Sequence, residues 1–376
     1  MARPTPKTGI DQIVDNLDIG CSNSRSPLSG RPPLVSIIVV NYNGEESLSG
    51  CLEALRADAS PAREIIVVDN ASTDTSLVIL TELRARHPDV IVVWSERNVG
   101  YAGGVNLGLK AAQGTYIAVL NMDVIVDSGW LVPLIAFLED HPEVGAVNPL
   151  IALSDRRRIN ALGQTLHITG LGFNRNLNRL IANVDPKPVR VTGIQGAAFV
   201  MRRALLERMG GMDVTGFLYH EDVNLSWMLN LMGLDLFCLP QSVVHHEYVL
   251  SMYPAKLHLL ERNRWAMLFA YLSRATLLLL MPVLIATEAL MWGYCLLRGW
   301  PFIRAKALSY RWVFRHRVHI AKRRRVAQSL RVLSDAQLLR RLRWGYAWDQ
   351  FATLARERGT TLRPPRDGIS PEIANG

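Results

Sequence analysis

The chain has 376 residues, of which 49% are hydrophobic, and a formal net charge of +9. This length allows one large domain of about 200–250 residues plus an appendage, and the hydrophobic content excludes an intrinsically disordered protein. The four cysteines are far apart and form no Cys-x-x-Cys pair. That spacing argues against a zinc site or a disulfide framework and suits a reducing cytoplasm.

Strand and helix patterns alternate along the first half of the chain. Residues 1–33 contain several Pro, Ser and Gly, and we predict that they form a mobile leader. Helical spacing of apolar residues follows at 45–56, and Asp74 can cap a helix that runs to about residue 83. Runs rich in β-branched residues predict strands at 35–40, 64–68, 90–94 and 116–120. This βαβαβ order favours an α/β fold with a doubly wound, mostly parallel sheet.

The second half of this domain has weaker signals. Residues 148–190 contain many Asn, Gly and Arg and predict loops or a short hairpin. A strand at 196–201 and a helix at 202–209, closed by Gly210-Gly211, come next. We predict the last strand at 234–239, followed by the apolar run 242–244.

A long apolar segment begins at residue 265. The part from 275 to 297 has about the length of a membrane-spanning helix, although Pro282 and Glu288 interrupt it. A helical hairpin lying in the membrane interface is the alternative, and a buried pair of soluble helices is a third. Arg262 and Arg264 precede this segment, where they either steady a diphosphate or mark the interface.

The basic excess of the chain follows this apolar segment. From Arg298 to Arg343 there are 14 Lys or Arg and a single acidic residue, Asp335. Such a composition suits the anionic cytoplasmic leaflet of a membrane, and nothing else in the sequence points to a nucleic-acid partner. We predict a helical membrane-associated segment at 265–350, with an amphipathic helix beyond residue 322, and a flexible tail at 351–376.

Two acidic clusters stand where strands are expected to end. Asn121-Met122-Asp123 follows the strand at 116–120, and His220-Glu221-Asp222 opens a helical pattern. Carboxylates at such strand ends point into the ligand crevice of an open α/β sheet. One can hold a divalent metal on a diphosphate, and the other can take a proton from an attacking hydroxyl. The structural alternative for each cluster is a turn residue or an acid at a helix N-terminus.

Three further motifs flank the same expected crevice. Asn41-Tyr42-Asn43 and Asp69 follow the first two strands, where an Asp can accept a hydrogen bond from a base or ribose. The glycine-rich segment 98–106 leads into a helix and allows close backbone approach to a phosphate, but it lacks the GxGxxG spacing. His245-His246 follows the last apolar run and can supply a metal ligand, with a structural histidine as the alternative.

Together these motifs resemble glycosyltransferase family 2, which has the GT-A fold, and most closely its rhamnosyltransferase-like branch. The resemblance covers roughly residues 34–265 and implies a GT-A catalytic domain at 34–264. The matching segments follow the family's order: Val35–Asn43, Val67–Ser72, Asn98–Asn106, Leu120–Val124, Gly193–Met201, Phe217–Trp227 and Val243–His246. Each segment is weak by itself, whereas seven in order are specific.

The resemblance implies inverting transfer of a sugar from a nucleotide diphosphate sugar, either UDP-linked or similar to dTDP-rhamnose, with Mg²⁺ or Mn²⁺ as cofactor. Asp222 would be the general base with Glu221 beside it, and Asp123 and His245 would hold the metal. The nucleotide and sugar would contact Asn41, Asn43, Asp69, Asn98, Gly100, Asn106 and Asn121.

Some residues depart from the family pattern. Asn121 stands where many relatives have the first acid, and Met122 replaces the usual proline. Asn224 and Met228 replace the acid and the arginine of the pattern Glu-Asp-x-Asp-Leu-x-x-Arg. The helix ion pair made by that arginine is therefore missing from this sequence, whereas Asp222 is present.

We predict an enzyme that transfers a hexosyl or deoxyhexosyl group to a lipid-linked or cell-envelope glycan at the cytoplasmic face of the inner membrane. A nucleotidyltransferase would have a cation directly after the first strand, where this chain has Asn41-Tyr42-Asn43-Gly44. A catalytically weak relative that acts as a membrane scaffold or binding protein is the alternative, and Asn224 and Met228 leave it open. The sequence does not predict the oligomeric state.

Overall fold

The computed structural model describes residues 34–58, 60, 63–248 and 250–356. The predicted leader at 1–33 lies outside the described residues, as does the predicted tail from residue 357 onward. Residues 348–356 form a helix, so helical structure continues past the boundary predicted at residue 350.

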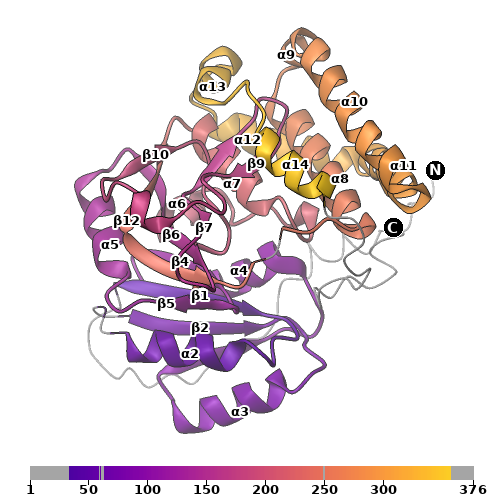
Figure 1. Ribbon diagram of the computed structural model, residues 1–376. Helices are drawn as coiled ribbons and strands as arrows, with labels where there is room; N and C mark the ends of the chain where they lie inside the picture. The colour runs from indigo at the N-terminus through magenta and orange to yellow at the C-terminus, as the bar shows by residue number, and fades with distance from the viewer. Residues whose placement is uncertain (1–33, 59, 61–62, 249, 357–376) are drawn as a thin grey trace, which may run out of the picture. The chain divides into compact units, whose positions relative to one another are not determined.

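A ten-stranded sheet runs through the domain (Figure 1). One part of it is parallel and contains β1 (Val35–Asn41), β2 (Arg63–Asp69), β3 (Val90–Trp94) and β4 (Tyr116–Asn121). β1 lies between β2 and β4, and all seven of its residues are buried, as expected for an apolar strand covered on both faces. The predicted strands and the α/β class are confirmed here.

The other part of the sheet is mixed. Its strands are β5 (Val124–Val126), β6 (Val144–Leu153), β7 (Ile159–Ala161), β10 (Val189–Val191), β11 (Ala198–Arg202) and β12 (Asp235–His246). β11 is antiparallel to both of its neighbours, β4 and β6, whereas β12 is parallel to β6 and antiparallel to β5. The antiparallel β11 thus joins the parallel strands β1–β4 to the parallel pair β6 and β12.

Helices cover both faces of the parallel strands, and the period of two along β1 assigns each side chain to a face. Ile37 and Val39 pack in one core with α2 (Leu48–Ala57) and α5 (Leu131–Asp140). Ile38 and Val40 lie against α4 (Gly100–Ala111), where an added Cβ at Gly104 or Gly108 would meet them. The glycines of the predicted glycine-rich segment therefore allow close helix–sheet packing.

The region predicted as loops or a short hairpin is more ordered than expected. Residues 148–153 belong to β6 and are buried, and they pair with β12 on one side while Ile151 and Ala152 pair with β7 on the other. A short hairpin is present, formed by β8 (Gln164–Leu166) and β9 (Gly172–Asn174). The polar residues of this region argued against a buried strand in the sequence. Asn148 can nevertheless be buried in β6, because its side chain forms hydrogen bonds with the backbone of residues 195 and 198.

The predicted last strand and the apolar run after it form the single strand β12. Its pairing with β6 shifts in register between Leu239 and Val243, which is where the sequence pattern is interrupted. Before β12 come α6 (Arg203–Arg208), the 3₁₀ turn η2 (Val214–Gly216) and α7 (Glu221–Leu231). Helix α3 (Ser76–Arg86) follows β2, and its Leu80 packs in the same core as α2 and α5. The 3₁₀ turn η1 (Ile181–Asn183) precedes β10.

The C-terminal region consists of helices that turn back on one another (Figure 1). They are α8 (Pro254–Tyr271), α9 (Arg274–Leu279), α10 (Met281–Arg298), α11 (Trp300–Arg315), α12 (Arg317–Leu330), α13 (Asp335–Arg341) and α14 (Trp348–Arg356). The apolar segment from residue 265 is divided among three of them, and the predicted amphipathic helix beyond residue 322 is split between α12 and α13. Within the described part of the chain, none of the helices has the length and apolarity needed to cross a membrane.

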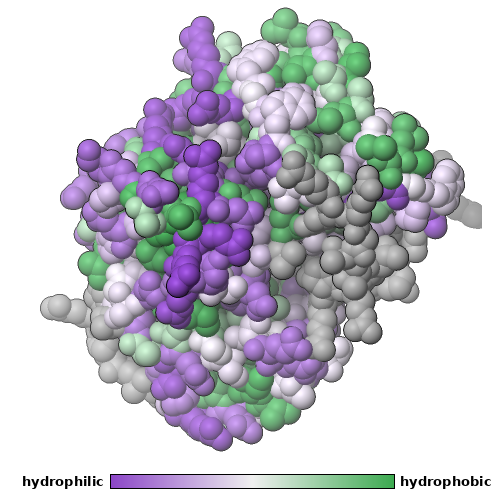
Figure 2. All heavy atoms as spheres, viewed as in Figure 1, coloured by the Kyte–Doolittle hydropathy of each residue, from purple (hydrophilic) through white to green (hydrophobic). Residues whose placement is uncertain are grey.

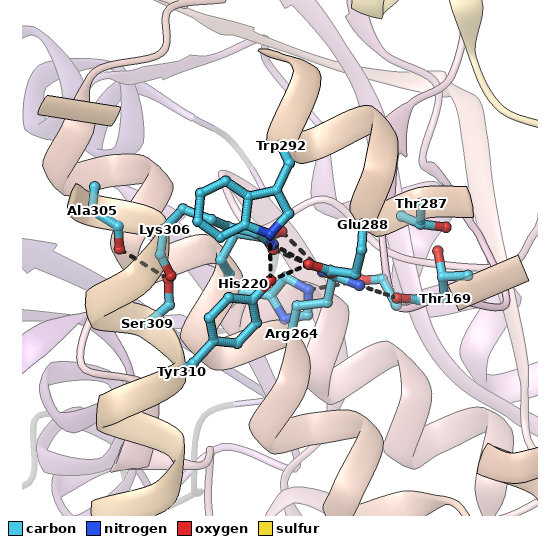
Figure 3. Close-up of polar contacts among 12 residues, drawn as sticks. Thr169, His220, Arg264, Thr287, Glu288, Trp292, Ala305, Lys306, Ser309 and Tyr310 are labelled. Atoms are coloured by element: carbon cyan, nitrogen blue, oxygen red, sulfur yellow. Dashed lines mark hydrogen bonds and ion pairs between the residues drawn. The ribbon is translucent and has the colours of Figure 1, made fainter. Parts of the chain in front are cut away.

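A buried cluster of four charges ties three of these helices together (Figure 3). Arg264 of α8 donates to both carboxylate oxygens of Glu261, at 2.9 and 2.7 Å, and also pairs with Glu288 of α10. Lys306 of α11 is fully buried, pairs with Glu261 and lies 2.7 Å from Glu288. Burial alone would raise the pKa of Glu261, but Arg264 and Lys306 outweigh it and hold that pKa at about 2. Glu288, which interrupts the apolar segment in the sequence, therefore points inward and forms ion pairs with Arg264 and Lys306.

Lys306→Met should lower the free energy of unfolding by roughly 3–5 kcal/mol, because it leaves Glu261 and Glu288 with one cation between them in a buried site. Arg304→Met, two residues earlier on the same helix and exposed, should change it by less than about 0.5 kcal/mol. Urea unfolding of the two variants beside the parent chain measures both values. Equal effects of the two substitutions would contradict the role assigned to the cluster.

Candidate active site

A cavity of about 610 Å³ opens at the carboxyl ends of β1 and β4. This is the edge of an open α/β sheet where ligands bind. Polar side chains enter it from the end of β4, the end of β12 and the start of α7, and apolar side chains enter from the C-terminal helices. The polar residues include Asn70, Asn98, Asn121, Asp123, Gln164, Glu221, Asp222 and His246.

Asn41, Asn43 and Asp69 were predicted to contact the nucleotide, but they lie behind the cavity wall. β1–β2 pairing sets Asn41 opposite Asp69, and Asn41 Nδ2 donates to Asp69 Oδ1 at 2.9 Å and to Ser72 Oγ at 3.0 Å. Ser72 N donates to Asp69 Oδ2 at 3.1 Å, and Asn43 N to Ser72 Oγ at 3.0 Å. This network fixes the loops after the two strands relative to each other.

Asn70, which the sequence analysis did not select, lies in the cavity wall beside the predicted Asn98 and Gly100. Asn70 Nδ2 donates to Asn98 Oδ1 at 2.9 Å and to the Gly100 carbonyl at 3.2 Å, and its Oδ1 accepts from Val99 N. Gly100 has φ of +75°, and a Cβ there would clash with the carbonyl of Phe217. Asn70 directly follows Asp69 at the end of β2, and this position at a strand end is the sequence feature from which its place in the cavity could have been predicted.

Asn106 lies farther from the cavity. Its Nδ2 donates to the Met212 carbonyl at 2.9 Å, and its Oδ1 accepts from Met212 N at 2.8 Å. This pair of bonds fastens α4 to the loop before α7. Asn106 therefore supports the site through the backbone, and it is absent from the residues that line the cavity.

The two consecutive histidines at the end of β12 point in different directions. His246 lines the cavity, and its Nε2 lies 3.4 Å from Asp123 Oδ1. His245, which the resemblance assigned to the metal, instead lies with Nε2 2.9 Å from Oδ1 of Asp127, outside the cavity-lining residues. The structure thus places His246 next to Asp123 and not the predicted His245.

Asp123 and His246 have the chemistry of a metal half-site. His246 Nδ1 lies 2.9 Å from Asn160 Oδ1, an atom that can only accept, so Nδ1 donates there and the ring is oriented with Nε2 toward Asp123. Asp123 Oδ1 is buried and accepts no hydrogen bond from any described residue. Among the described residues no group of three His, Cys, Asp or Glu side chains could hold a metal. Mg²⁺ often takes one or two protein ligands and completes its shell with phosphate oxygens and water, so the pair fits such an ion.

The carboxylates at the start of α7 are held differently from each other. Asp222 Oδ2 accepts from Gln164 Nε2 at 2.9 Å and from Gly196 N at 3.1 Å, and its Oδ1 accepts from Val223 N. Glu221 Oε2 is buried and accepts no hydrogen bond from the described chain. Burial raises the pKa of both groups, and the charge of Asp222 raises that of Glu221 further. Glu221 therefore keeps its proton while Asp222, with three donors, ionises first.

Tyr101 adds a neutral hydroxyl to the same wall. It stands in the first turn of α4, and its OH donates to the Gly196 carbonyl at 3.1 Å. Burial, followed by the charges of Glu221, Asp123 and Asp222, raises its pKa well above the ordinary value. The phenol remains protonated and donates a hydrogen bond beside the backbone that holds Asp222.

The loop before α7 is strained and is held by α8. Phe217, Tyr219 and His220 all have positive φ, which is costly for residues with a Cβ. Asn263 Nδ2 lies 2.8–3.1 Å from the carbonyl oxygens of residues 216, 218 and 219, and His220 Nε2 lies 2.8 Å from the carbonyl of residue 170. These contacts offset the strain and fix the position from which Glu221 and Asp222 enter the cavity.

Arg262 and Arg264 are both buried on α8, so neither marks a membrane interface. Arg262 Nη2 donates to the Gly216 carbonyl at 3.3 Å and supports the loop before α7. Arg264 lines the cavity, but its guanidinium is engaged by the charge cluster and by the Thr169 carbonyl at 3.1 Å. Both arginines thus have structural partners.

The departures at Asn224 and Met228 are accommodated within the fold. Asn224 Nδ2 donates to Asp213 Oδ2 at 3.3 Å, and the Tyr271 hydroxyl donates to Asn224 Oδ1. Arg323 of α12 lies 3.2 Å from Asp213 and supplies an ion pair beside α7. Met228 is fully buried among apolar residues. Asn224 thus has hydrogen-bond partners and Met228 is packed in the core at this side of α7.

Comparison with known proteins finds a family match in the first half of the chain. The family model "Glycosyl transferase family 2" matches residues 36–210. Poly-beta-1,6-N-acetyl-D-glucosamine synthase of Staphylococcus epidermidis is 26% identical over 214 residues, which are 56% of this chain and 48% of that protein. The O-antigen biosynthesis protein RfbC of Myxococcus xanthus is 29% identical over 233 residues, covering 59% and 18%. The chain spans less than half the length of these relatives.

The fold also resembles a solved structure. The crystal structure of GalNAc-T7 with UDP, GalNAc and Mn²⁺ aligns with a TM-score of 0.53 and 18% identity, over 65% of this chain and 49% of that chain. At this identity the similarity extends to the fold alone. It agrees with the GT-A architecture that the sequence motifs predicted.

Glu221→Gln should increase the free energy of unfolding, and by more at pH 8 than at pH 5. Because folding raises the pKa of Glu221, the native state holds this proton more tightly than the unfolded chain, and stability falls as the pH rises from the unfolded pKa through the folded one. Glutamine avoids this loss, which is on the order of 1.4 kcal/mol for each unit by which the pKa is raised. Urea unfolding at the two pH values measures it. Glu53→Gln, exposed on α2, is the control, and a gain independent of pH would argue against a protonated Glu221.

Proposed function

Residues 36–210 belong to glycosyltransferase family 2, and on this premise we propose that the protein transfers a sugar from a nucleotide diphosphate sugar to an acceptor hydroxyl by a single, inverting displacement. The observation that carries the proposal is the placement of Asp222 and Asp123 in one cavity at the carboxyl edge of the sheet. A transferase of this kind needs a base for the acceptor and a place for the charge of the leaving diphosphate.

Asp222 is the general base. Its three hydrogen-bond donors favour the carboxylate, and burial raises its pKa toward the range in which it can accept a proton effectively. It takes the proton of the acceptor hydroxyl as that oxygen attacks the anomeric carbon opposite the diphosphate. Glu221, whose pKa is raised, stays protonated and leaves Asp222 as the ionised member of the pair.

Asp123 and His246 are the proposed ligands of Mg²⁺ or Mn²⁺, and His246 replaces the predicted His245. The support is the 3.4 Å distance between His246 Nε2 and Asp123 Oδ1, and the orientation of His246 by Asn160. When bound, such an ion would offset the negative charge that develops on the diphosphate. Asn70 and Asn98, at the wall formed by the loops after β2 and β3, face the donor nucleotide.

The acceptor enters from the opposite, apolar end of the cavity. That end is lined from the β8–β9 hairpin and the C-terminal helices by Leu171, Phe173, Leu257, Leu260, Met291, Phe351 and Leu354. Such a lining suits an acceptor with an apolar part, such as a lipid-linked glycan. The curated relatives in poly-N-acetylglucosamine and O-antigen synthesis are consistent with a cell-envelope product made at the cytoplasmic face of the membrane. A UDP-sugar or a donor similar to dTDP-rhamnose is the proposed sugar source.

A scaffold without turnover, the alternative left open by Asn224 and Met228, is not favoured. Both substitutions have local partners or packing that preserve α7, and Asp222 remains held in the cavity.

Asp222→Asn should lower the rate of nucleoside diphosphate release by about 10²–10⁴-fold, because amide nitrogen and oxygen cannot take the acceptor proton. The assay uses detergent-purified protein with UDP-, GDP- and dTDP-sugars, Mn²⁺, and a membrane lipid extract as acceptor. Asp127→Asn is the matched control, since Asp127 lies outside the residues that line the cavity. Release that survives Asp222→Asn would remove it as the base, and nucleotide binding without release from any donor would favour the scaffold.

His246→Ala should weaken Mn²⁺ binding in the presence of nucleoside diphosphate by at least about 10-fold, because one of two protein ligands is lost. His245→Ala, at the neighbouring position but paired with Asp127, should leave Mn²⁺ affinity close to that of the parent chain. Isothermal titration calorimetry of the three proteins measures the difference directly. The reverse order of the two variants would restore the original assignment of His245.

A further inference from the structure

The outward side of α9 and α10 is an apolar surface with cations only at its ends, at Arg274 and Arg298. Residues 275–297 contain one charged side chain, Glu288. Figure 2 shows hydrophobic residues gathered at the upper right, where Figure 1 places these helices and the start of α11. We define the docking face by its large exposed side chains: Leu278, Leu279, Met281, Ile285, Leu296 and Leu297. Leu279 and Leu297 are 77% and 85% exposed, which is unusual for leucines in consecutive helices.

Glu288 is turned away from this face by the buried charge cluster. Its carboxylate pairs with Arg264 and Lys306 and accepts from the Tyr310 hydroxyl, on the side of α10 that packs against α8 and α11 (Figure 3). Met291 on the same inner side lines the cavity. The helix therefore places its only acid inside and keeps its outer side apolar.

Exposed cations follow the docking face along the chain. α11 begins one residue after α10 and packs against it, and α12 continues from α11. The exposed cationic residues of these two helices are Arg304, Arg311, Arg315, Arg317, Lys322 and Arg325. No acidic residue occurs between residues 289 and 334. The other cations have inward partners: Lys306 joins the charge cluster, and Arg323 contacts Asp213.

An uncharged apolar surface beside a row of cations matches the two chemistries of an anionic bilayer surface. Leucine and isoleucine side chains enter the boundary between headgroups and acyl chains, and arginine and lysine attract the anionic headgroups. A second copy of the chain would bring the same cations together across the contact, which is unfavourable. We propose that the docking face binds an anionic lipid bilayer with α9 and α10 lying in its interface, and that the exposed cations of α11 and α12 contact the lipid headgroups.

This arrangement also has a consequence for the acceptor, which rests on the proposed function. Helix α10 has the docking face on one side and Met291, at the apolar end of the cavity, on the other. Docking would bring that end of the cavity close to the lipid. A glycan acceptor anchored in the bilayer could then reach Asp222 while its lipid remains in the membrane.

The test is sedimentation of the full chain with vesicles, which does not depend on catalysis. The parent chain should bind vesicles of phosphatidylcholine with 30–40% phosphatidylglycerol (about one anionic lipid in three) and bind pure phosphatidylcholine much less, because each cation near an anionic surface contributes roughly 1 kcal/mol. Ile285→Glu combined with Leu296→Glu should lower binding to the anionic vesicles by at least about 10-fold. Val78→Glu, at an exposed apolar position on α3, is the matched control and should bind like the parent.

A second variant tests the electrostatic part. Arg311→Gln with Arg315→Gln should weaken binding to anionic vesicles and reduce its sensitivity to salt, because fewer cations meet the headgroups. Failure of the parent chain to bind anionic vesicles, or equal binding by Ile285→Glu/Leu296→Glu, would overturn the proposal. A lipid-free dimer in analytical ultracentrifugation that the same substitutions dissociate would assign the face to a second copy. Sugar transfer in detergent by a variant that no longer binds vesicles would separate this proposal from the proposed function.

Discussion

The buried contacts of α8 are the constraint on which the site depends. Arg264 is held between Glu261 and Glu288, and Lys306 completes a cluster in which two cations balance two carboxylates. This cluster fixes α8 against α10 and α11. On the same helix, Asn263 holds the strained loop that precedes Glu221 and Asp222. The C-terminal helices therefore help to position the two carboxylates at the start of α7, and truncating them would release that loop.

The balance of neighbouring charges gives the two buried pairs of carboxylates different protonation states. Glu261 has two cations within contact distance, and its pKa is held at about 2. Glu221 is equally buried but has Asp222 as its charged neighbour, so its pKa is raised and it retains a proton. Two acids buried in neighbouring parts of the same cavity wall thus reach opposite protonation states. Glu261, paired with two cations, stabilises the helices. Among the described residues, Glu221 and Asp222 have no cation beside them that lowers their pKa, and groups with such raised pKa values are suited to proton transfer.

Individual residues show which features of the fold and the cavity could be predicted from the sequence and which could not. The strands at 35–40 and 64–68 were predictable because buried parallel strands require long β-branched runs. The position of Asp123 and Asp222 in the cavity was predictable because they follow strand and loop ends at the ligand edge of the sheet. His245 and His246 were not distinguishable, since adjacent residues of a strand face opposite sides and the register shift in β12 decides which one meets Asp123. Asn41 and Asp69 were placed at the correct edge, but their mutual hydrogen bonds hold them behind the cavity wall.

The sequence by itself determined the parallel strands β1–β4 with the helices between them, the resemblance to a family and the acids at the strand ends, because these features follow from local periodicity and short motifs. Only the tertiary structure decided which partners those residues have. Glu288 interrupts an apolar run in the sequence, and it is the approach of Arg264 and Lys306 from two other helices that turns it inward. Such partners lie tens of residues apart in the chain, so pairing, burial and protonation state arise only when packing brings them together.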